Sequence, residues 1–148
     1  MTYTIGQVSE MIGLPISTLR YYDKMGLFPH MKRVSGVRQF SDTEVDALRI
    51  IACLKKSGLE IKYIKQFMDW CVLGRDTYPQ RKALFEKQIE TVETEIDRMN
   101  HVLTLLKYKR WYYTQAILDG NEERLQTIQS EDIPEEIRAA FEELHPSV

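Results

Sequence analysis

Four polar side chains near the start of the chain share one face of a predicted helix. They are Ser17, Arg20, Tyr21 and Lys24, which follow one another at helical spacing. Their hydroxyl, guanidinium, phenol and ammonium groups can bind the phosphates and sugars of a nucleic acid. Thr18, beside Ser17 at the start of this helix, is the side chain that we expect to approach base edges in a major groove. The chemistry of this face is that of DNA recognition, although short hydroxyls read sequence weakly.

A short basic loop leads from this helix to a second stretch that we interpret as a β-wing. Arg20, Arg33 and Arg38 can neutralise phosphates, so binding should weaken steeply as the salt concentration rises. For each cation the alternative is an ordinary solvated surface charge. Phe40, like Tyr22, is also a candidate for the core. Beyond the helix face, the predicted DNA-binding residues are Thr4, Ile5, Lys32, Arg33, Ser35, Gly36, Val37, Arg38 and Phe40.

Two short helices joined by a tight turn are predicted to position the polar face. Thr4 and Gln7 have the spacing of a capping box, which marks the start of the first helix. Gly13 ends that helix because a residue without Cβ adopts the left-handed conformation readily, and Pro15 can begin the next helix. The apolar residues that can seat the two helices on a core are Ile5, Val8, Ile12, Leu19 and Tyr22.

With these features in place, the segment from Ile5 to about Ile64 resembles the MerR family of bacterial transcription regulators. Several motifs match with their spacing preserved, so chance is a poor explanation. Two departures lie in the wing, where family members often have tyrosines. This chain has Val37 and Phe40 there, which removes two phenol donors. The matching motifs are Ile5-Gly6, Thr18-Leu19-Arg20-Tyr21-Tyr22, Gly26-Leu27, Gly36-x-Arg38-x-Phe40, and Gly58-Leu59 followed by Ile61 and Ile64.

The resemblance implies a mainly α fold, with a winged helix-turn-helix head and a long dimerisation helix that forms an antiparallel coiled coil. It also implies a homodimer on a pseudo-palindromic promoter with an over-long spacer. Such regulators bend and untwist the DNA so that RNA polymerase meets both promoter elements, and an inducer shifts the balance between two states. Activation rather than repression rests on the resemblance alone.

Two helices are expected between the wing and the long helix. Ser41 and Glu44 form a second capping box, and the helix that they begin should continue to about Ser57. A further helix is predicted from Ile61 to Leu73, with a narrow polar strip and apolar side chains nearly everywhere else. We expect this helix to be buried on several sides and to end at Gly74.

The clearest periodicity begins at Phe85, where residues of one stripe alternate at the spacings of a coiled-coil heptad. About 40 residues at about 1.5 Å each give a rod of about 60 Å, too long to pack on its own small head. We predict a homodimer rather than an intramolecular hairpin, because the chain has no second helix of equal length. Arg110 is the one charged residue of the stripe and can set the register or pair with an acid of the partner. The predicted dimer interface, here called the seam, is Phe85, Ile89, Val92, Ile96, Met99, Leu103, Leu106, Arg110, Tyr113 and Ile117.

Length and charge agree with a DNA-binding module plus a dimerisation element. A chain of 148 residues that is 43% apolar can bury a modest core and has little room for an enclosed ligand-binding domain. Residues 1–75 contain 11 Lys and Arg against 7 Asp and Glu, whereas residues 76–148 contain 9 against 15. The basic half coincides with the recognition motif. We predict a winged helix-turn-helix domain at 1–75, a coiled-coil helix at 76–119 and an acidic C-terminal effector or packing segment at 120–148.

The sequence offers two candidate sites for an inducer. The sequence around Cys53 is similar to the Cys-containing segment of the AdhR and NmlR subgroup, which implies a response to reactive aldehydes and thiol stress. Arg49 and Lys56 lie within one helical turn on the same face, where two cations would favour the thiolate. The alternative is that Cys53 packs as a small hydrophobe between helices. For Cys71 we expect core packing.

A second hypothesis places an apolar inducer among aromatic side chains near the end of the long helix. Aromatic walls with a few polar tips suit such ligands. In an antiparallel dimer the cluster of Tyr108, Trp111, Tyr112 and Tyr113 would lie near the head of the other protomer, close to Trp70 and Phe67 there. The alternative is an aromatic plug that holds the rod to the head. The residues of this candidate pocket are Phe67, Trp70, Tyr108, Trp111 and Tyr112.

Other classes of function are disfavoured by the motifs that the sequence lacks. No nucleophile with a base, phosphate-binding glycine loop or paired-carboxylate motif occurs at a usable spacing, so we assign no catalytic residues. No cysteine follows Cys71 and the three histidines are far apart, so we predict neither a metal site nor a cofactor. No apolar run approaches the roughly 18 residues of a membrane span, and we expect a cytoplasmic protein with no membrane partner. The strongest competitor from another class is a coiled-coil scaffold without specific DNA readout.

Overall fold

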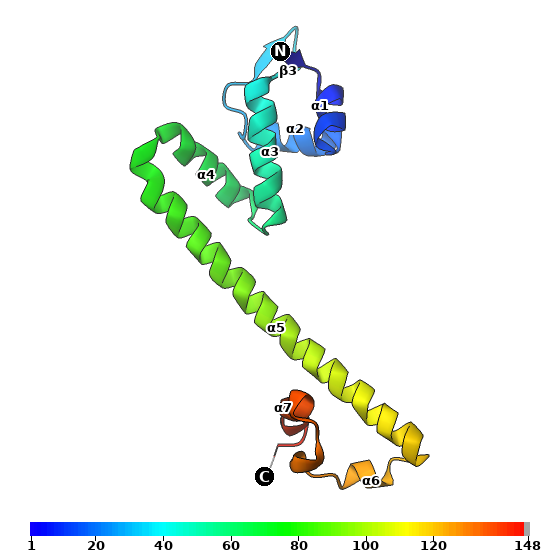
Figure 1. Ribbon diagram of the computed structural model, residues 1–148. Helices are drawn as coiled ribbons and strands as arrows, with labels where there is room; N and C mark the ends of the chain where they lie inside the picture. The colour runs from blue at the N-terminus through cyan, green and yellow to red at the C-terminus, as the bar shows by residue number, and fades with distance from the viewer. Residues whose placement is uncertain (147–148) are drawn as a thin grey trace. The chain divides into compact units, whose positions relative to one another are not determined.

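The computed structural model describes residues 1–146, and most of them are helical (Figure 1). The chain divides into two compact units, the first from Met1 to Gln88 and the second from Ile89 onward. Among the described residues, no helix has the length and apolar character needed to cross a membrane. The predicted mainly α fold with a small wing is confirmed.

The first helix of the first unit begins and ends, and the second begins, where the sequence predicts. The Thr4 hydroxyl accepts a hydrogen bond from the Gln7 backbone N–H at 3.3 Å, and Gln7 Oε1 accepts one from the Thr4 N–H at 2.9 Å. Gly13 follows the first helix in the left-handed conformation, with φ at 72°. These helices are α1 (Ile5–Ile12) and α2 (Ile16–Lys24).

The wing is a β-hairpin within an antiparallel sheet of strand order β1-β3-β2. Ser35 and Gly36 form its turn with positive φ values of 50° and 79°, which is typical of a type I′ hairpin turn. The strand register places Arg33 opposite Arg38, and β1 pairs with the other edge of the central strand. The strands are β1 (Thr2–Tyr3), β2 (Lys32–Val34) and β3 (Val37–Ser41).

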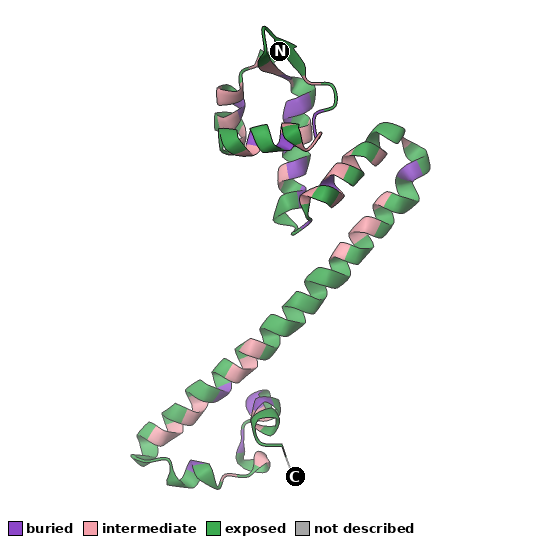
Figure 2. Ribbon diagram, turned by 180° about the vertical axis from the view of Figure 1, so that it is seen from behind, coloured by how far each residue is buried: buried purple, intermediate pink, exposed green. Residues whose placement is uncertain are grey.

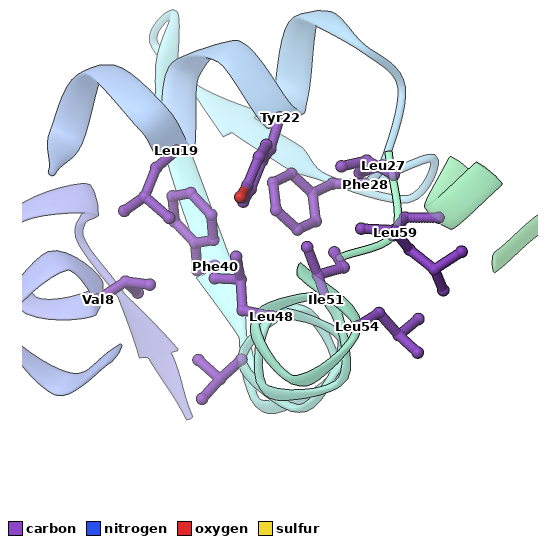
Figure 3. Close-up of a cluster of buried hydrophobic side chains, with 12 residues drawn as sticks. Val8, Leu19, Tyr22, Leu27, Phe28, Phe40, Leu48, Ile51, Leu54 and Leu59 are labelled. Carbon is purple, nitrogen blue, oxygen red and sulfur yellow. The ribbon is translucent and has the colours of Figure 1, made fainter. Parts of the chain in front are cut away.

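One apolar core joins the wing to the helices of the first unit (Figure 3). α3 (Asp42–Lys56) begins with the predicted capping box of Ser41 and Glu44, and it packs against α1 and β3. Leu48 and Ile51 on its inner face are fully buried. The buried core residues are Val8, Leu19, Tyr22, Leu27, Phe28, Phe40, Val45, Leu48, Ile51, Leu54, Leu59 and Ile64.

The next helix, α4 (Ile61–Leu73), ends at Gly74 as predicted, and the burial that we expected on several of its sides is partial. Ile64 is its one fully buried residue, while Ile61, Tyr63, Phe67 and Met68 are half-buried against the core of the first unit. Val72 is exposed at the far end of α4. Cys71 is exposed there too, so the prediction that it packs in the core is wrong.

The second unit consists of most of the long helix and a C-terminal tail, residues 120–146, that packs on it. Tyr108 is 2% exposed because Ile137 and Ala140 of the tail cover its ring. His101 binds Glu143 at 2.9 Å on the same side of the helix. The helices are α5 (Tyr78–Asp119), α6 (Glu123–Gln126) and α7 (Glu135–Leu144), the last being the final helix that the sequence predicts.

Candidate nucleic-acid interface

α2 presents its predicted polar face to solvent and its other face to the core. Leu19 is fully buried and Tyr22 nearly so, and burial raises the pKa of the Tyr22 phenol. Thr18, at the start of the helix, is half-buried. Because the apolar side holds the helix in place, the polar side can meet a nucleic acid without rearrangement of the fold. The exposed polar residues are Ser17, Arg20, Tyr21 and Lys24.

Asp23 joins α2 to the wing, a role that the sequence analysis missed. Its Oδ2 accepts hydrogen bonds from Nη2 of Arg33 and Nε of Arg38, both at 2.7 Å. The Asp23 side chain is only 11% exposed, so water screens this shared ion pair weakly. The two arginines oppose each other across the hairpin, and the carboxylate offsets their mutual repulsion. Asp23 therefore holds the cations of the wing beside the cationic face of α2.

Both arginines keep donors for a phosphate while they bind Asp23. A guanidinium has five N–H groups, and each bond to Asp23 uses a single nitrogen of its arginine. Arg33 is exposed and Arg38 half-buried. The sequence does contain a signal for this contact, namely one acid inside a basic recognition helix that is followed by two arginines at a wing.

The structure overturns one predicted DNA contact. Phe40 is fully buried and packs edge-to-face against Phe28, with ring centroids 5.7 Å apart, so the prediction that Phe40 contacts DNA is wrong. Ile5 packs against the core and Thr4 caps α1, which gives both a structural role whatever else they contact. The predicted DNA contacts of the wing that are exposed are Lys32, Arg33, Ser35, Gly36 and Val37.

Both cysteines are exposed in this chain and neither forms a disulfide. Because Cys53 is exposed on α3, it does not pack between helices within one copy of the chain. Arg49, one turn before it, donates to Asp46 at 2.7 Å. Arg81 approaches the Cys71 sulfur with Nη1 at 3.7 Å. Within residues 1–146, no group of three or more His, Cys, Asp and Glu side chains is placed to hold a metal ion.

The aromatic residues of the candidate effector pocket belong to two separate clusters. Phe67 and Trp70 lie on α4, where Phe67 packs on Phe85 with ring centroids 5.3 Å apart. Tyr108 belongs to the second unit and stacks on Trp111 at 6.3 Å. Because the tail of the same chain covers Tyr108, its ring is not available to line an open pocket, and that part of the prediction is corrected.

Trp111 and Tyr112 lie at the margin of the second cluster. The Tyr112 hydroxyl donates to Glu122 Oε2 at 2.7 Å, and this bond to a carboxylate raises the pKa of Tyr112 to about 12. Trp111 borders an open cavity of about 380 Å³ between α5 and the tail. The other residues that line this cavity are Lys107, Arg110, Thr114, Pro134, Glu136 and Ile137.

The seam is exposed throughout the second unit, as the green stretch of α5 in Figure 2 illustrates. Ile96, near its middle, is 52% exposed. Phe85, at the other end, is half-buried against Phe67. A continuous apolar stripe of this length in solvent marks an interaction surface. The exposed apolar seam residues are Ile89, Val92, Ile96, Met99, Leu103, Leu106, Tyr113 and Ile117.

Comparison with known proteins relates this architecture to one group of regulators. A family model described as "MerR HTH family regulatory protein" matches residues 3–70. An uncharacterized HTH-type transcriptional regulator of Haemophilus influenzae is 40% identical over 117 residues, which are 78% of this chain and 87% of that protein. The regulator AdhR of Bacillus subtilis is 33% identical over 81 residues, covering 54% of this chain and 58% of AdhR.

Solved structures give the same relationship. The crystal structure of HiNmlR, described as a MerR family regulator lacking the sensor domain and bound to promoter DNA, superposes with a TM-score of 0.62 at 39% identity. The match covers 82% of this chain and 97% of that one. A MerR family regulator from Bacillus thuringiensis matches with a TM-score of 0.59 at 42% identity, over 74% of this chain and 96% of its own.

Proposed function

Because the chain belongs to the MerR family of helix-turn-helix regulators, we propose that it binds promoter DNA through α2 and the wing. The observation that carries this proposal is the bond network of Asp23, which places Arg33 and Arg38 beside the exposed cationic face of α2. The HiNmlR structure, bound to promoter DNA, supports it. In this proposal Arg20, Arg33 and Arg38 bind phosphates, and Thr18 with Ser17 approaches the bases.

The protein acts as a homodimer through the seam, and residues 1–75, 76–119 and 120–148 supply DNA binding, dimerisation and an effector or packing segment. Support comes from the exposure of the seam along α5, which has 42 residues. Two copies would place two recognition helices on a pseudo-palindromic promoter. By analogy with the family, the dimer changes the shape of the DNA and so controls access of RNA polymerase.

Salt-dependent binding to a promoter fragment tests the DNA-binding proposal. Fluorescence anisotropy should give a dissociation constant that rises steeply with salt, and Arg20→Ala should weaken binding and reduce the slope by about one. Arg124→Ala, a matched change on α6, should alter neither value. If Arg20→Ala behaved like Arg124→Ala, the competing interpretation of a coiled-coil scaffold without DNA readout would be favoured.

For the inducer, we propose an electrophile such as a reactive aldehyde, which reacts with the Cys53 thiol. The exposure of Cys53 on α3 and the similarity to AdhR support this choice. In-vitro transcription with and without an aldehyde should show a response that Cys53→Ser abolishes and that the matched variant Cys71→Ser retains. A response that survives Cys53→Ser would favour the alternative, an apolar ligand at the cavity beside Trp111.

A further inference from the structure

The tail packs on the side of α5 away from the apolar seam residues and reaches one seam residue, Arg110, at the cavity that Pro134 and Glu136 also line. In the heptad whose inward positions form the seam, His101 and Tyr108 take the outermost position, and both contact α7. Trp111, a neighbour of that position, also packs against the tail cluster. The tail therefore covers the back of the helix and leaves the apolar residues of the seam open, so the seam requires an occupant from outside the chain.

The spacing of the seam is the same when it is followed from either end. Such a palindromic pattern fits a second, antiparallel copy of the same helix. The two-fold axis would cross the seam between Met99 and Leu103, at the level of residue 101 along the helix. The axis pairs Ile96 with Leu106 and brings every apolar residue against another seam residue. The facing residues within the second unit are Ile89 with Tyr113, Val92 with Arg110, Ile96 with Leu106, and Met99 with Leu103.

The charged residues that flank the seam complement one another in this arrangement. In an antiparallel coiled coil, equivalent flanking positions of the two helices face each other. Glu93 then faces Lys107 of the second copy, and Glu95 faces Lys109 of the second copy. All four side chains are exposed within one chain. Glu95 also binds Arg98 in its own helix at 2.7 Å, but that pair is exposed and contributes little, so it does not prevent the contact.

Other arrangements lose this complementarity. A shift of one copy by one heptad in either direction places Glu95 opposite Val102 or opposite Ala116. In a parallel dimer, Glu95 faces Asn100 and Lys109 faces Thr114. The acids therefore meet bases on both sides of the seam in the antiparallel register centred at the level of residue 101.

The resemblance to the MerR family implies an antiparallel homodimer; within it we propose that Glu93 pairs with Lys107 and Glu95 with Lys109 of the second copy, and that these pairs fix the register. This inference rests on the homodimer of the proposed function and adds the residues that fix its register. Arg110 lies in the seam next to Glu93 of the second copy and contributes to the same charge pattern.

Charge reversal on each side of the proposed pairs provides the test. One full-length variant carries Glu93→Lys and Glu95→Lys, and the other carries Lys107→Glu and Lys109→Glu. Each should repel its own copies, and the dimer dissociation constant in sedimentation equilibrium should rise at least about tenfold. An equimolar mixture should restore dimerisation, because every reversed side chain then faces an opposite charge. Rescue by mixing also excludes misfolding as the cause of the losses.

A matched control places the same charge change away from the seam, with Glu90→Lys and Asp97→Lys at outer heptad positions. This variant should dimerise like the wild type. The register is overturned if a reversed variant dimerises as tightly as the wild type, or if the mixture associates no better than its components. A monomeric wild type would overturn the proposed homodimer itself, whereas DNA binding by the first unit is measured separately by anisotropy.

Discussion

The two units differ in where their apolar side chains find partners. In the first unit, a core drawn from α1, α2, α3 and the wing is closed within one chain, and Asp23 fixes two of the cations that we assign to DNA. In the second unit, the tail buries Tyr108, while Ile96 and Leu106 remain in solvent. One copy is therefore sufficient to build the recognition surface, whereas the seam has no partner within the chain and, in our proposal, is covered by a second copy.

The largest expected effect comes from a charge in the seam. Ile96→Asp would place two unpaired carboxylates in each dimer, opposite Leu106 of the other copy. Each costs a few kcal/mol, so the dimer dissociation constant should rise at least about a thousandfold. Sedimentation should show monomers, whereas circular dichroism should show an intact first unit.

Asp97→Ala, on the outer side of the same helix, serves as the control for Ile96→Asp and should leave the dimer unchanged. If Ile96→Asp still formed a dimer, the seam would not be the dimer interface. The proposed contrast between a first unit that closes its own core and a second unit that needs a partner would then be wrong.

Loss of packing in the first unit should have the next largest effect. Phe40→Ala removes a fully buried ring and leaves a cavity against Phe28, which should cost about 3–5 kcal/mol of unfolding free energy. Val37→Ala, on the exposed side of the same strand, should cost less than about 0.5 kcal/mol. Chemical denaturation followed by circular dichroism measures both. Equal losses for the two variants would mean that the core of the first unit does not close as described.

Asp23→Asn separates positioning from simple charge. The substitution removes a negative charge near the proposed phosphate sites, so electrostatics alone would strengthen DNA binding. It also frees Arg33 and Arg38 from their shared partner, so the wing should no longer be held beside α2. We expect the second effect to win and affinity in anisotropy to fall about tenfold, since bonds to charged groups contribute about 1.5–3 kcal/mol each. Asp46→Asn, which breaks only the exposed pair with Arg49, should change DNA affinity little. Tighter DNA binding by Asp23→Asn would contradict the positioning role of Asp23.

Local signals in the sequence were sufficient for the elements of the fold. The capping boxes at Thr4 and Ser41, the end of α1 at Gly13 and the end of α4 at Gly74 all depend on residues close together in the chain. Helix periodicity likewise identified the polar face of α2. Such features can be predicted because the groups that decide them are neighbours in sequence.

Contacts between distant residues could not be predicted in the same way. The acid at Asp23 and the two wing arginines can be seen in the sequence, but that they bind each other depends on how α2 meets the wing. The covering of Tyr108 by α7 likewise depends on how separate elements meet. The apolar character of α4 predicted burial, yet Val72 is exposed, since composition does not say which faces have a neighbour. The identity of an inducer is harder again to predict from the sequence, because it depends on the reactivity or shape of a site rather than on a repeating pattern.

The smallest expected effect tests whether the tail is fixed on α5 as the structure describes. The bond to Glu122 raises the pKa of Tyr112 from 10.0 to about 12, so Glu122→Gln should lower it towards 10 in an ultraviolet titration. Because the folded state holds the phenol proton more tightly than the unfolded chain, the contribution of this bond to stability is present below about pH 10 and is lost as the pH rises towards about 12. Glu123→Gln, the neighbouring acid, should leave the titration unchanged. If Tyr112 had the same pKa in the wild type, Glu122→Gln and Glu123→Gln, the start of the tail would not be held on α5. The side of α5 away from the seam would then be exposed there, as the seam is.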